Sequence, residues 1–272
     1  MEKHFVYNNS RVSYRIEGDG QPVVLLHGFG EDSRIWNSQL AALKKEYRLI
    51  IPDLPGSGNS EILSKENTDL VDYADCLKAL LDFEKIDRFI LLGHSMGGYI
   101  TLAFAEKYPE MLQAFGLVHA TAFADSEEKK AARRKGIEMI KEYGLEAFLK
   151  NTTPNLFSKK FKQNSPDRMN ELIEQGKNFS KEALIQYYNA MLQRPDRTAV
   201  LKEAQVPVLF IIGMEDVAAP LKDLLEQVHL PKLSHIHIIE GVGHMSMMEE
   251  SEKLNEYLLS FLKNVDDVDV DS

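Results

Sequence analysis

The sequence predicts an α/β protein with a mostly parallel β-sheet flanked by helices and a helical insertion late in the chain. Two observations lead to this prediction. Short unbroken apolar runs, typical of strands buried on both faces of a parallel sheet, alternate with segments whose apolar residues recur at helical spacing. This alternation is the pattern of βαβ units. It stops between residues 125 and 197, where no strand-like run occurs.

The expected elements follow in order along the chain. Alternating polar and apolar residues around Asn8-Asn9-Ser10 predict an exposed antiparallel hairpin over residues 4–17. Buried strands are expected at Pro22–His27, Tyr47–Pro52, the apolar run starting at Phe89, Ala114–His119, Pro207–Gly213 and Ile236–Glu240. Helices are expected at Trp36–Leu43, from Thr68 as N-cap to about Phe83, from the end of the Phe89 run to Tyr108, and at Met247–Leu262.

The insertion divides the chain into a predicted core and a predicted cap. We expect residues 1–121 and 198–264 to form the core and residues 122–197 a helical cap, or lid. Its helices are predicted at Ser126–Lys150, Pro166–Lys177 and Lys181–Gln193, the last two preceded by capping serines at 165 and 180. The acidic residues 265–272 are expected to be a disordered tail.

Composition narrows the class of protein. The 272 residues are 44% hydrophobic and 27% charged, as in an ordinary soluble globular protein. A net charge of −10 argues against nucleic acid and anionic membranes as partners. No signal-peptide pattern or membrane-length apolar run occurs, and the one cysteine, Cys76, fits a reducing compartment. We therefore expect a cytoplasmic monomer or homodimer whose partner is a small molecule.

The most informative stretch is the end of the Phe89 run, which passes into Gly93-His94-Ser95-Met96-Gly97-Gly98 and then a helix. A strand that turns directly into a helix needs a strained residue at the bend, with glycines beside it because a Cβ would clash there. The bend would present the Ser95 hydroxyl at a helix N-terminus, where negative charge is favoured. This is the nucleophile-elbow pattern of acyl-transfer enzymes. The alternative is a glycine-rich turn with a capping serine.

A serine nucleophile needs a base, and the base needs an orienting group. Two later strand ends offer them, since catalytic groups of open α/β sheets gather at the carboxyl ends of the strands. Glu215 and Asp216 follow the strand that ends at Gly213, and His244 follows the last strand. The order serine, acid, histidine then matches one known triad order.

With these residues the chain resembles the α/β-hydrolase superfamily over Val12 to Leu262. The matching stretches are His27-Gly28-Phe29-Gly30, Asp53-x-x-Gly56-x-Gly58-x-Ser60, the Ser95 elbow, Gly213-Met214-Glu215-Asp216 with Pro220, and Gly243-His244. A serine at the elbow separates the chain from haloalkane dehalogenases and related epoxide hydrolases, which carry aspartate there. The resemblance implies an esterase, a thioesterase, a carbon–carbon bond hydrolase or a cofactor-free haloperoxidase-like enzyme, with neither cofactor nor metal.

Roles follow from the chemistry and the resemblance together. Ser95 is expected to attack a carbonyl, His244 to move the proton and Asp216, in preference to Glu215, to orient His244. Backbone N–H groups of Phe29 and Met96 are the expected oxyanion hole. The resemblance gives structural roles to His27, His94 and Asp53, and some members place the acid near His119 and Asp125, although His119 itself occupies that position here.

The predicted function is hydrolysis of a small or medium carboxylic ester, or a related acyl substrate, through a Ser-His-Asp triad and an acyl-enzyme. The substrate pocket is predicted to include Phe29, Phe123, Phe148, Tyr187 and Met191, although such aromatic residues also serve as helix-packing core. Two other functions stay open: a slow or non-hydrolytic ligand receptor of the same fold, and an acyltransferase that prefers another acceptor to water.

Overall fold

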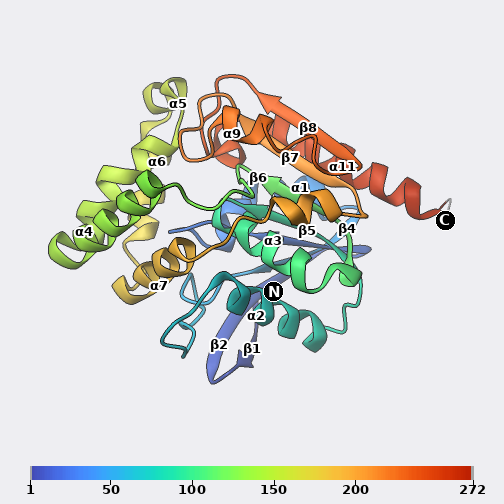
Figure 1. The fold of residues 1–272 in the computed structure, drawn as a ribbon, viewed down its shortest axis with the longest axis horizontal. Helices are drawn as coiled ribbons and strands as arrows, with labels where there is room; N and C mark the ends of the chain where they lie inside the picture. The colour runs from blue at the N-terminus through green and yellow to red at the C-terminus, as the bar shows by residue number, and fades with distance from the viewer. Residues whose placement is uncertain (1, 271–272) are drawn as a thin grey trace.

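In the computed structural model, which describes residues 2–270, eight strands form one sheet in the order β1-β2-β4-β3-β5-β6-β7-β8 (Figure 1). The first two pairings, β1 with β2 and β2 with β4, are antiparallel, and all the others are parallel. The strands are Glu2–Tyr7 (β1), Ser10–Glu17 (β2), Gln21–Leu26 (β3), Tyr47–Pro52 (β4), Phe89–His94 (β5), Leu112–Val118 (β6), Val208–Gly213 (β7) and Ser234–Ile239 (β8). The predicted α/β class and the N-terminal hairpin are confirmed.

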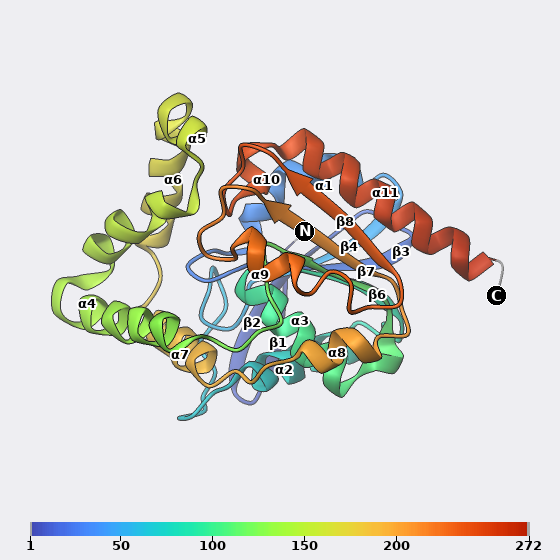
Figure 2. The ribbon, with the colours of Figure 1, turned by 45° about the horizontal axis from the view of Figure 1, so that its top comes forward.

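Helices cover both faces of this sheet (Figure 2). The helices are Asn37–Leu43 (α1), Leu70–Phe83 (α2), Met96–Lys107 (α3), Glu127–Thr152 (α4), Lys159–Asn164 (α5), Pro166–Gly176 (α6), Lys181–Leu192 (α7), Thr198–Glu203 (α8), Leu221–Leu225 (α9), Ser246–Glu249 (α10) and Ser251–Val270 (α11). Short 3₁₀ turns lie at Ser33–Trp36, Pro109–Met111 and Thr153–Leu156. Helices α2 and α3 pack together on one face, and α1 and α11 on the other.

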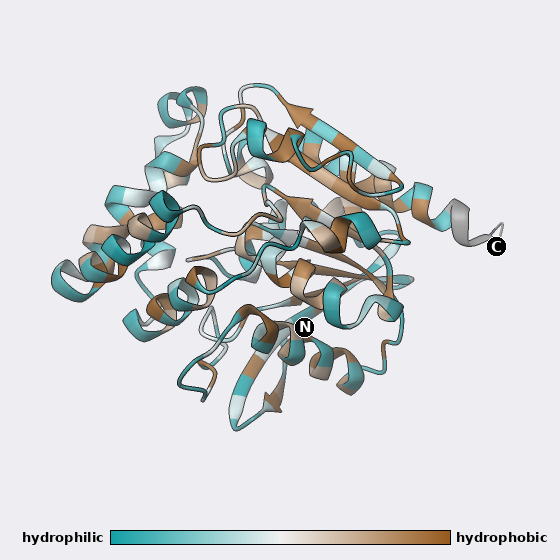
Figure 3. Ribbon diagram, in the orientation of Figure 1, coloured by the Kyte–Doolittle hydropathy of each residue, from teal (hydrophilic) through white to brown (hydrophobic). Residues whose placement is uncertain are grey.

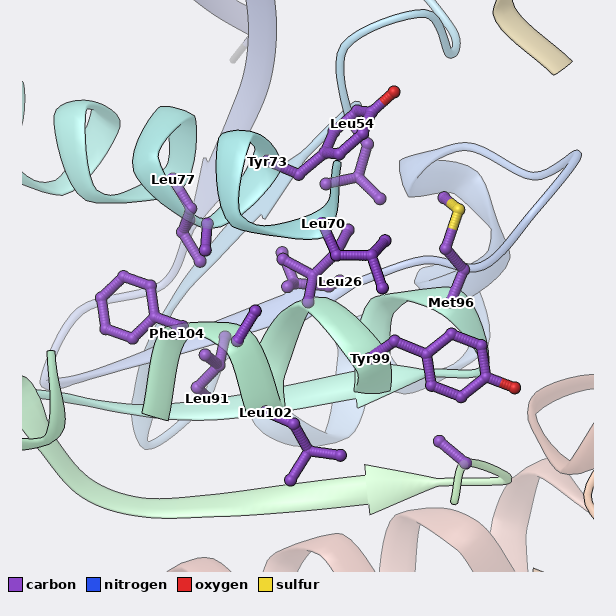
Figure 4. Packing of buried hydrophobic residues seen from close by; sticks show 14 of the residues in the cluster. Leu26, Leu54, Leu70, Tyr73, Leu77, Leu91, Met96, Tyr99, Leu102 and Phe104 are labelled. Atoms are coloured by element: carbon purple, nitrogen blue, oxygen red, sulfur yellow. The ribbon is translucent and has the colours of Figure 1, made fainter. Parts of the chain in front are cut away.

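Strand β3 shows why the central strands are unbroken apolar runs. Val24 and Leu26 belong to the core on the α2–α3 side, whereas Val23 and Leu25 belong to the core on the α1–α11 side. Because successive side chains of a strand point to opposite faces, a strand covered on both sides needs an apolar residue at every position. In Figure 3 the strands of the sheet are largely brown, which marks hydrophobic residues. Figure 4 shows Tyr73 of α2 among the packed residues of the α2–α3 core.

Four helices of the insertion, α4 to α7, gather on one side of the molecule (left in Figures 1 and 2). Ser126 caps α4 by accepting a hydrogen bond from the backbone N–H of Lys129, and Ser180 caps α7 in the same way. Gly144, with a φ of 84°, interrupts α4 in a conformation that other residues rarely adopt. The predicted helices are therefore present. That the segment acts as a cap stays a prediction.

The structure corrects two expectations about helix ends. Helix α11 continues to Val270, so residues 265–270 are not the predicted disordered tail; residues 271–272 lie outside the described part. Val265 is buried in the α1–α11 core, and the Tyr47 hydroxyl donates to Asp266, so the apolar stripe extends one turn beyond Leu262. At α2 the N-cap is Asp69, not Thr68, because Asp69 and Asp72 form a reciprocal capping box.

Among the described residues, none of the helices has the length and apolar character needed to cross a bilayer.

Candidate active site

Ser95 occupies the sharp turn between β5 and α3. Its φ of 51° lies in the left-handed region, which a non-glycine residue adopts only under strain. A Cβ on Gly93 would overlap the carbonyl of Gly97, and one on Gly97 would come within 2.6 Å of the His27 carbonyl oxygen. Only glycine fits these two positions, as the elbow pattern predicts. The Ser95 side chain does not cap α3, so the start of the helix makes no use of its hydroxyl.

A cavity of about 190 Å³ lies above this turn. Ser95 and His244 both contribute to its wall. The complete lining is Phe29, Glu31, Ser95, Tyr99, Arg133, Phe148, Thr152, Leu156, Tyr188, Met191, Ala218 and His244. A larger hollow of about 470 Å³ lies around Asp32, Arg34 and Asp53. It includes neither Ser95 nor His244, so we place the candidate site at the smaller cavity on chemical grounds.

Asp216 and His244 come together behind this cavity. The two follow β7 and β8, and Asp216 Oδ2 lies 2.8 Å from His244 Nδ1. The other oxygen, Oδ1, accepts the backbone N–H groups of Ala218 and Ala219, which fixes the carboxylate orientation. Burial opposes ionisation, but the neighbouring histidines, His244 foremost, hold the pKa of Asp216 far below its usual range. An ionised Asp216 accepts from Nδ1–H of His244 and leaves Nε2 as the basic nitrogen.

Glu215, the competing acid, lies elsewhere. Its side chain accepts the backbone N–H of Lys159 at the start of α5, and the residue is exposed. The two acids lie in the turn that follows β7, where the backbone N–H of Asp216 donates to the Gly213 carbonyl, and their side chains have different partners. Of the two, only Asp216 contacts a histidine among the described residues.

A second histidine shares the same carboxylate oxygen. His119 Nδ1 lies 3.2 Å from Asp216 Oδ2, and its Nε2 lies 2.8 Å from the Ser246 hydroxyl. Burial lowers the pKa of His119 to about 4, so the ring is neutral near pH 7. The neutral tautomer that fits donates from Nδ1 to Asp216 and accepts from Ser246 at Nε2. Some members of the superfamily carry the acid near this position. Here His119 occupies the position and contacts Asp216.

A buried chain of hydrogen bonds connects the loop of Phe29 with the loop of His244. Glu31 Oε2 accepts from the backbone N–H of Gly28 at 2.8 Å and from His94 Nδ1 at 2.9 Å. His94 Nε2 lies 2.9 Å from the His244 carbonyl oxygen. Since both ring nitrogens of His94 face acceptors, both carry a proton and the ring is an imidazolium. Burial works against the charge, yet Glu31 raises the pKa of His94, while His94 and Gly28 hold the pKa of Glu31 low despite its burial.

Replacing Glu31 with glutamine should test this buried pair. It leaves His94 without its counter-charge, so we expect the free energy of unfolding to fall by about 3 kcal/mol at pH 5.5, measured by urea denaturation. The loss should be largest between about pH 4.3 and 6.5. Below this range Glu31, whose pKa is lowered on folding, loses its contribution as it protonates in the folded state; above it His94, whose pKa is raised, loses its contribution as it deprotonates.

Glu146→Gln is the matched control, because Glu146 is an exposed partner of Lys150 on α4. It removes the same charge from a solvated pair, so its stability should follow that of the wild type. Equal losses in the two variants, or a loss independent of pH, would contradict the ion-pair interpretation.

Two residues that the resemblance treats as structural have bonding partners that suit this role. His27 Nε2 accepts the backbone N–H of Leu54, and its Nδ1 faces the Gly28 carbonyl oxygen. Asp53 accepts the backbone N–H groups of Ser33 and Asn59, and so holds the two loops together. Neither belongs to the cavity wall.

The predicted oxyanion donors stand in a suitable environment. Met96 is the first residue of α3, so its N–H has no acceptor within the helix. The loop that carries Phe29 approaches the elbow so closely that a Cβ on Gly28 would come within 3.1 Å of Ser95 Cβ. The roles of the two N–H groups stay predictions.

The predicted pocket wall is partly wrong. Phe29, Phe148 and Met191 line the cavity, but Phe123 and Tyr187 do not. The fully buried Tyr187 donates from its hydroxyl to the Pro55 carbonyl, and its ring lies behind that of Phe29. Tyr188 lines the wall in its place, stacked on Phe29 with ring centroids 4.3 Å apart. Sequence reasoning also missed Glu31, Tyr99, Arg133, Thr152, Leu156 and Ala218.

One further arrangement concerns metals. The ligand atoms of His119, Asp216 and His244 lie within 4.8 Å of one another, close enough to hold an ion. Both Nδ1 atoms, however, are at hydrogen-bond distance from the same carboxylate oxygen, and His119 Nε2 is bonded to Ser246. We interpret the group as a hydrogen-bonded network, because the atoms that could bind a metal are already hydrogen-bonded to one another or to Ser246.

Comparison with known proteins finds similarity to hydrolases in both sequence and structure. A sequence model described as the alpha/beta hydrolase family matches residues 23–257. The 2-hydroxy-6-oxononadienedioate/2-hydroxy-6-oxononatrienedioate hydrolase of Paraburkholderia phymatum is 30% identical, with 93% of this chain and 91% of that protein covered. A thermophilic esterase of Thermogutta terrifontis, solved with malate bound, has a TM-score of 0.89 at 28% identity and 94% coverage of both chains. The enol-lactonase of Burkholderia xenovorans has a TM-score of 0.89 at 23% identity, with 96% of this chain and 100% of that chain covered.

Two other matches cover a smaller share of the relative: 90% of this chain matches 64% of one, and 40% of this chain matches 32% of the other.

Proposed function

We propose, because this chain belongs to the alpha/beta hydrolase family, that it is a serine hydrolase that cleaves a small or medium acyl substrate, foremost a carboxylic ester. One observation supports this above all: His244 is hydrogen-bonded to a buried, ionised Asp216 and shares a cavity with Ser95. A base held by an acid beside a strained serine is the arrangement that acyl transfer requires.

In the proposed mechanism, Ser95 Oγ attacks the substrate carbonyl carbon while His244 Nε2 takes the hydroxyl proton. The carbonyl oxygen becomes an oxyanion, for which the N–H groups of Phe29 and Met96 are the proposed donors. Collapse of this intermediate breaks the bond to the leaving group, which receives the proton from His244. Water then attacks the acyl-Ser95 ester, His244 takes its proton, and Ser95 leaves with that proton as the acid product forms.

The second histidine on Asp216 has a consequence for this cycle. His244 becomes an imidazolium after each attack and needs a stable negative charge beside it. Because neutral His119 donates to the same oxygen, it stabilises Asp216 as an anion without adding a positive charge. The charge that balances protonated His244 is therefore kept in place.

The names of the relatives support the reaction class and leave the substrate open. An esterase, an enol-lactonase and a hydrolase of a keto dienedioate all act, by name, on compounds with an acyl carbon. For this chain, a carbon–carbon bond hydrolase is the second candidate, because the P. phymatum relative is similar over almost its entire length.

The test is hydrolysis of 4-nitrophenyl esters and acyl thioesters of two to twelve carbons, together with labelling by a fluorophosphonate probe. Because the cavity holds about 190 Å³, the short and medium esters should be preferred. Ligand binding without turnover or labelling would instead indicate the receptor alternative. Faster acyl transfer to an added alcohol or thiol than to water would indicate an acyltransferase.

Smaller side chains in the cavity wall should shift the preference for the length of the acyl chain. Met191→Ala and Phe148→Leu each remove part of the wall. We therefore expect kcat/KM to rise for esters of longer acyl chains, through KM more than kcat. One methylene in such a pocket changes kcat/KM by roughly 10- to 200-fold, and the rate profile across the ester series would show the shift.

Tyr187→Phe is the control for this series, because its hydroxyl lies behind the wall and bonds to Pro55. Its chain-length profile should match the wild type. A shift as large as that of Met191→Ala would show that the wall depends on packing further from the cavity.

A further inference from the structure

Two arginines share one buried carboxylate beside the cavity. Asp125 Oδ2 accepts from Arg133 Nε at 2.6 Å, and Oδ1 accepts from Arg133 Nη2 at 3.2 Å and from Arg194 Nη1 at 2.6 Å. Arg133 lies on α4, and Arg194 follows α7, so the contact connects the two helices. The Asp125 side chain is fully buried.

The cluster carries one positive charge in excess, because two guanidinium groups face a single carboxylate. Asp125 has a lowered pKa: burial opposes its ionisation, but the arginines outweigh that effect. A buried charge without a counter-charge is costly unless something pairs with it. Glu31, the acid among the residues that line the cavity, is already paired with His94 and does not neutralise the excess.

The excess charge is available on Arg133 and not on Arg194. Arg194 uses Nε and Nη2 on the Phe123 carbonyl and Nη1 on Asp125, and it lies 3.9 Å from the Tyr99 ring centroid. Arg133 lines the cavity with 18% of its side chain exposed, and its guanidinium carbon lies farther from a ring, 5.7 Å from the Tyr188 centroid. Within residues 2–270 its Nη1 makes no hydrogen bond.

We propose that Arg133 is a specificity residue that binds a carboxylate carried by the substrate in addition to its scissile acyl group. The inference rests on the proposed function and names its substrate class. A guanidinium presents parallel N–H donors that match a carboxylate, and here the Nη1 edge is free for this contact. An excess of one charge fits a monoanion better than a phosphate dianion. The substrate is thus an acyl compound with a separate acid end, such as a dicarboxylic monoester.

Two esters of equal chain length test this proposal: mono-4-nitrophenyl adipate, which ends in a carboxylate, and 4-nitrophenyl hexanoate, which ends in a methyl group. The wild type should prefer the adipate in kcat/KM. Arg133→Gln should lower the adipate-to-hexanoate ratio by roughly 10- to 100-fold, mainly through the KM for adipate, because the contact is present before and during reaction. Asp125 keeps Arg194 in this variant, so no buried acid is left unpaired.

Arg134→Gln is the matched control, since Arg134 is the next residue of α4 and is exposed. It removes the same charge and should keep the wild-type ratio. Arg133→Lys keeps a charge without the planar donors and should give an intermediate ratio, which also covers a failure of Arg133→Gln to fold.

An unchanged ratio in Arg133→Gln while both esters are hydrolysed would overturn the subsite and leave the proposed function intact. If the wild type hydrolyses neither ester, the proposed function fails, and calorimetric titration with monomethyl adipate decides on the subsite. Binding that Arg133→Gln weakens at least tenfold supports the subsite, and binding that is absent or insensitive to the substitution overturns it.

Discussion

Ser95→Ala and His244→Ala are each expected to reduce kcat for a 4-nitrophenyl ester by about 10⁶-fold, and the double variant to be little worse. Without the hydroxyl there is no nucleophile, and without the imidazole the hydroxyl keeps its proton, so either loss disables the same step. The glycines at 93 and 97 already accommodate the turn, and alanine at position 95 adds no bulk to it. Steady-state kinetics with the purified variants would measure the effect.

A fluorophosphonate probe gives an independent measurement of the same prediction. It should label the wild type and Ser260→Ala, which changes an exposed serine of α11, and should not label Ser95→Ala. Labelling that persists in Ser95→Ala would mean that another side chain is the nucleophile.

Asp216→Asn is expected to reduce kcat by about 10⁴-fold while the fold is retained. The structure gives the reason. The N–H groups of Ala218 and Ala219 require an oxygen at Oδ1, so the asparagine amide would direct its NH₂ group at the histidines. His244 would then accept at Nδ1 and carry its proton on Nε2, where the base is needed.

Glu215→Gln is the control for this substitution, because Glu215 contacts Lys159 and not a histidine. Its kcat should stay within a fewfold of the wild type. A larger loss in Glu215→Gln than in Asp216→Asn would reverse the assignment of the acid. Circular dichroism and urea denaturation of both variants would separate chemistry from folding.

The features that sequence predicted well are those with a local cause. Strand β7 and residues 23–26 of β3 are continuous apolar runs because both faces are covered, and this pattern is visible without tertiary information. The elbow glycines and the strand-end positions of Asp216 and His244 also depend on short stretches of chain. These stretches were sufficient to select the residues of the candidate triad.

The missed features depend on contacts between distant segments. Tyr187 and Tyr188 are neighbours in one helix, and only the packing of α7 against Phe29 decides which ring lines the cavity. Glu31 and His94 pair across segments far apart in the chain, as do His119 and Asp216. No local periodicity marks such pairs. The extension of α11 was hidden by its aspartates, which outweighed one buried valine at position 265.

The strand order also has a consequence for how the protein is made. Strand β6 pairs with β7 across the whole insertion, with Phe115 opposite Val208, so a nascent chain that ends before β7 leaves one side of β6 unpaired. An apolar strand with a free edge is a site for aggregation, and a long loop must close before the pairing forms. Asp216 and His244 are synthesised only after that point. A chain truncated within the insertion therefore lacks two residues of the candidate triad, Asp216 and His244, and the proposed activity would report completion of the sheet.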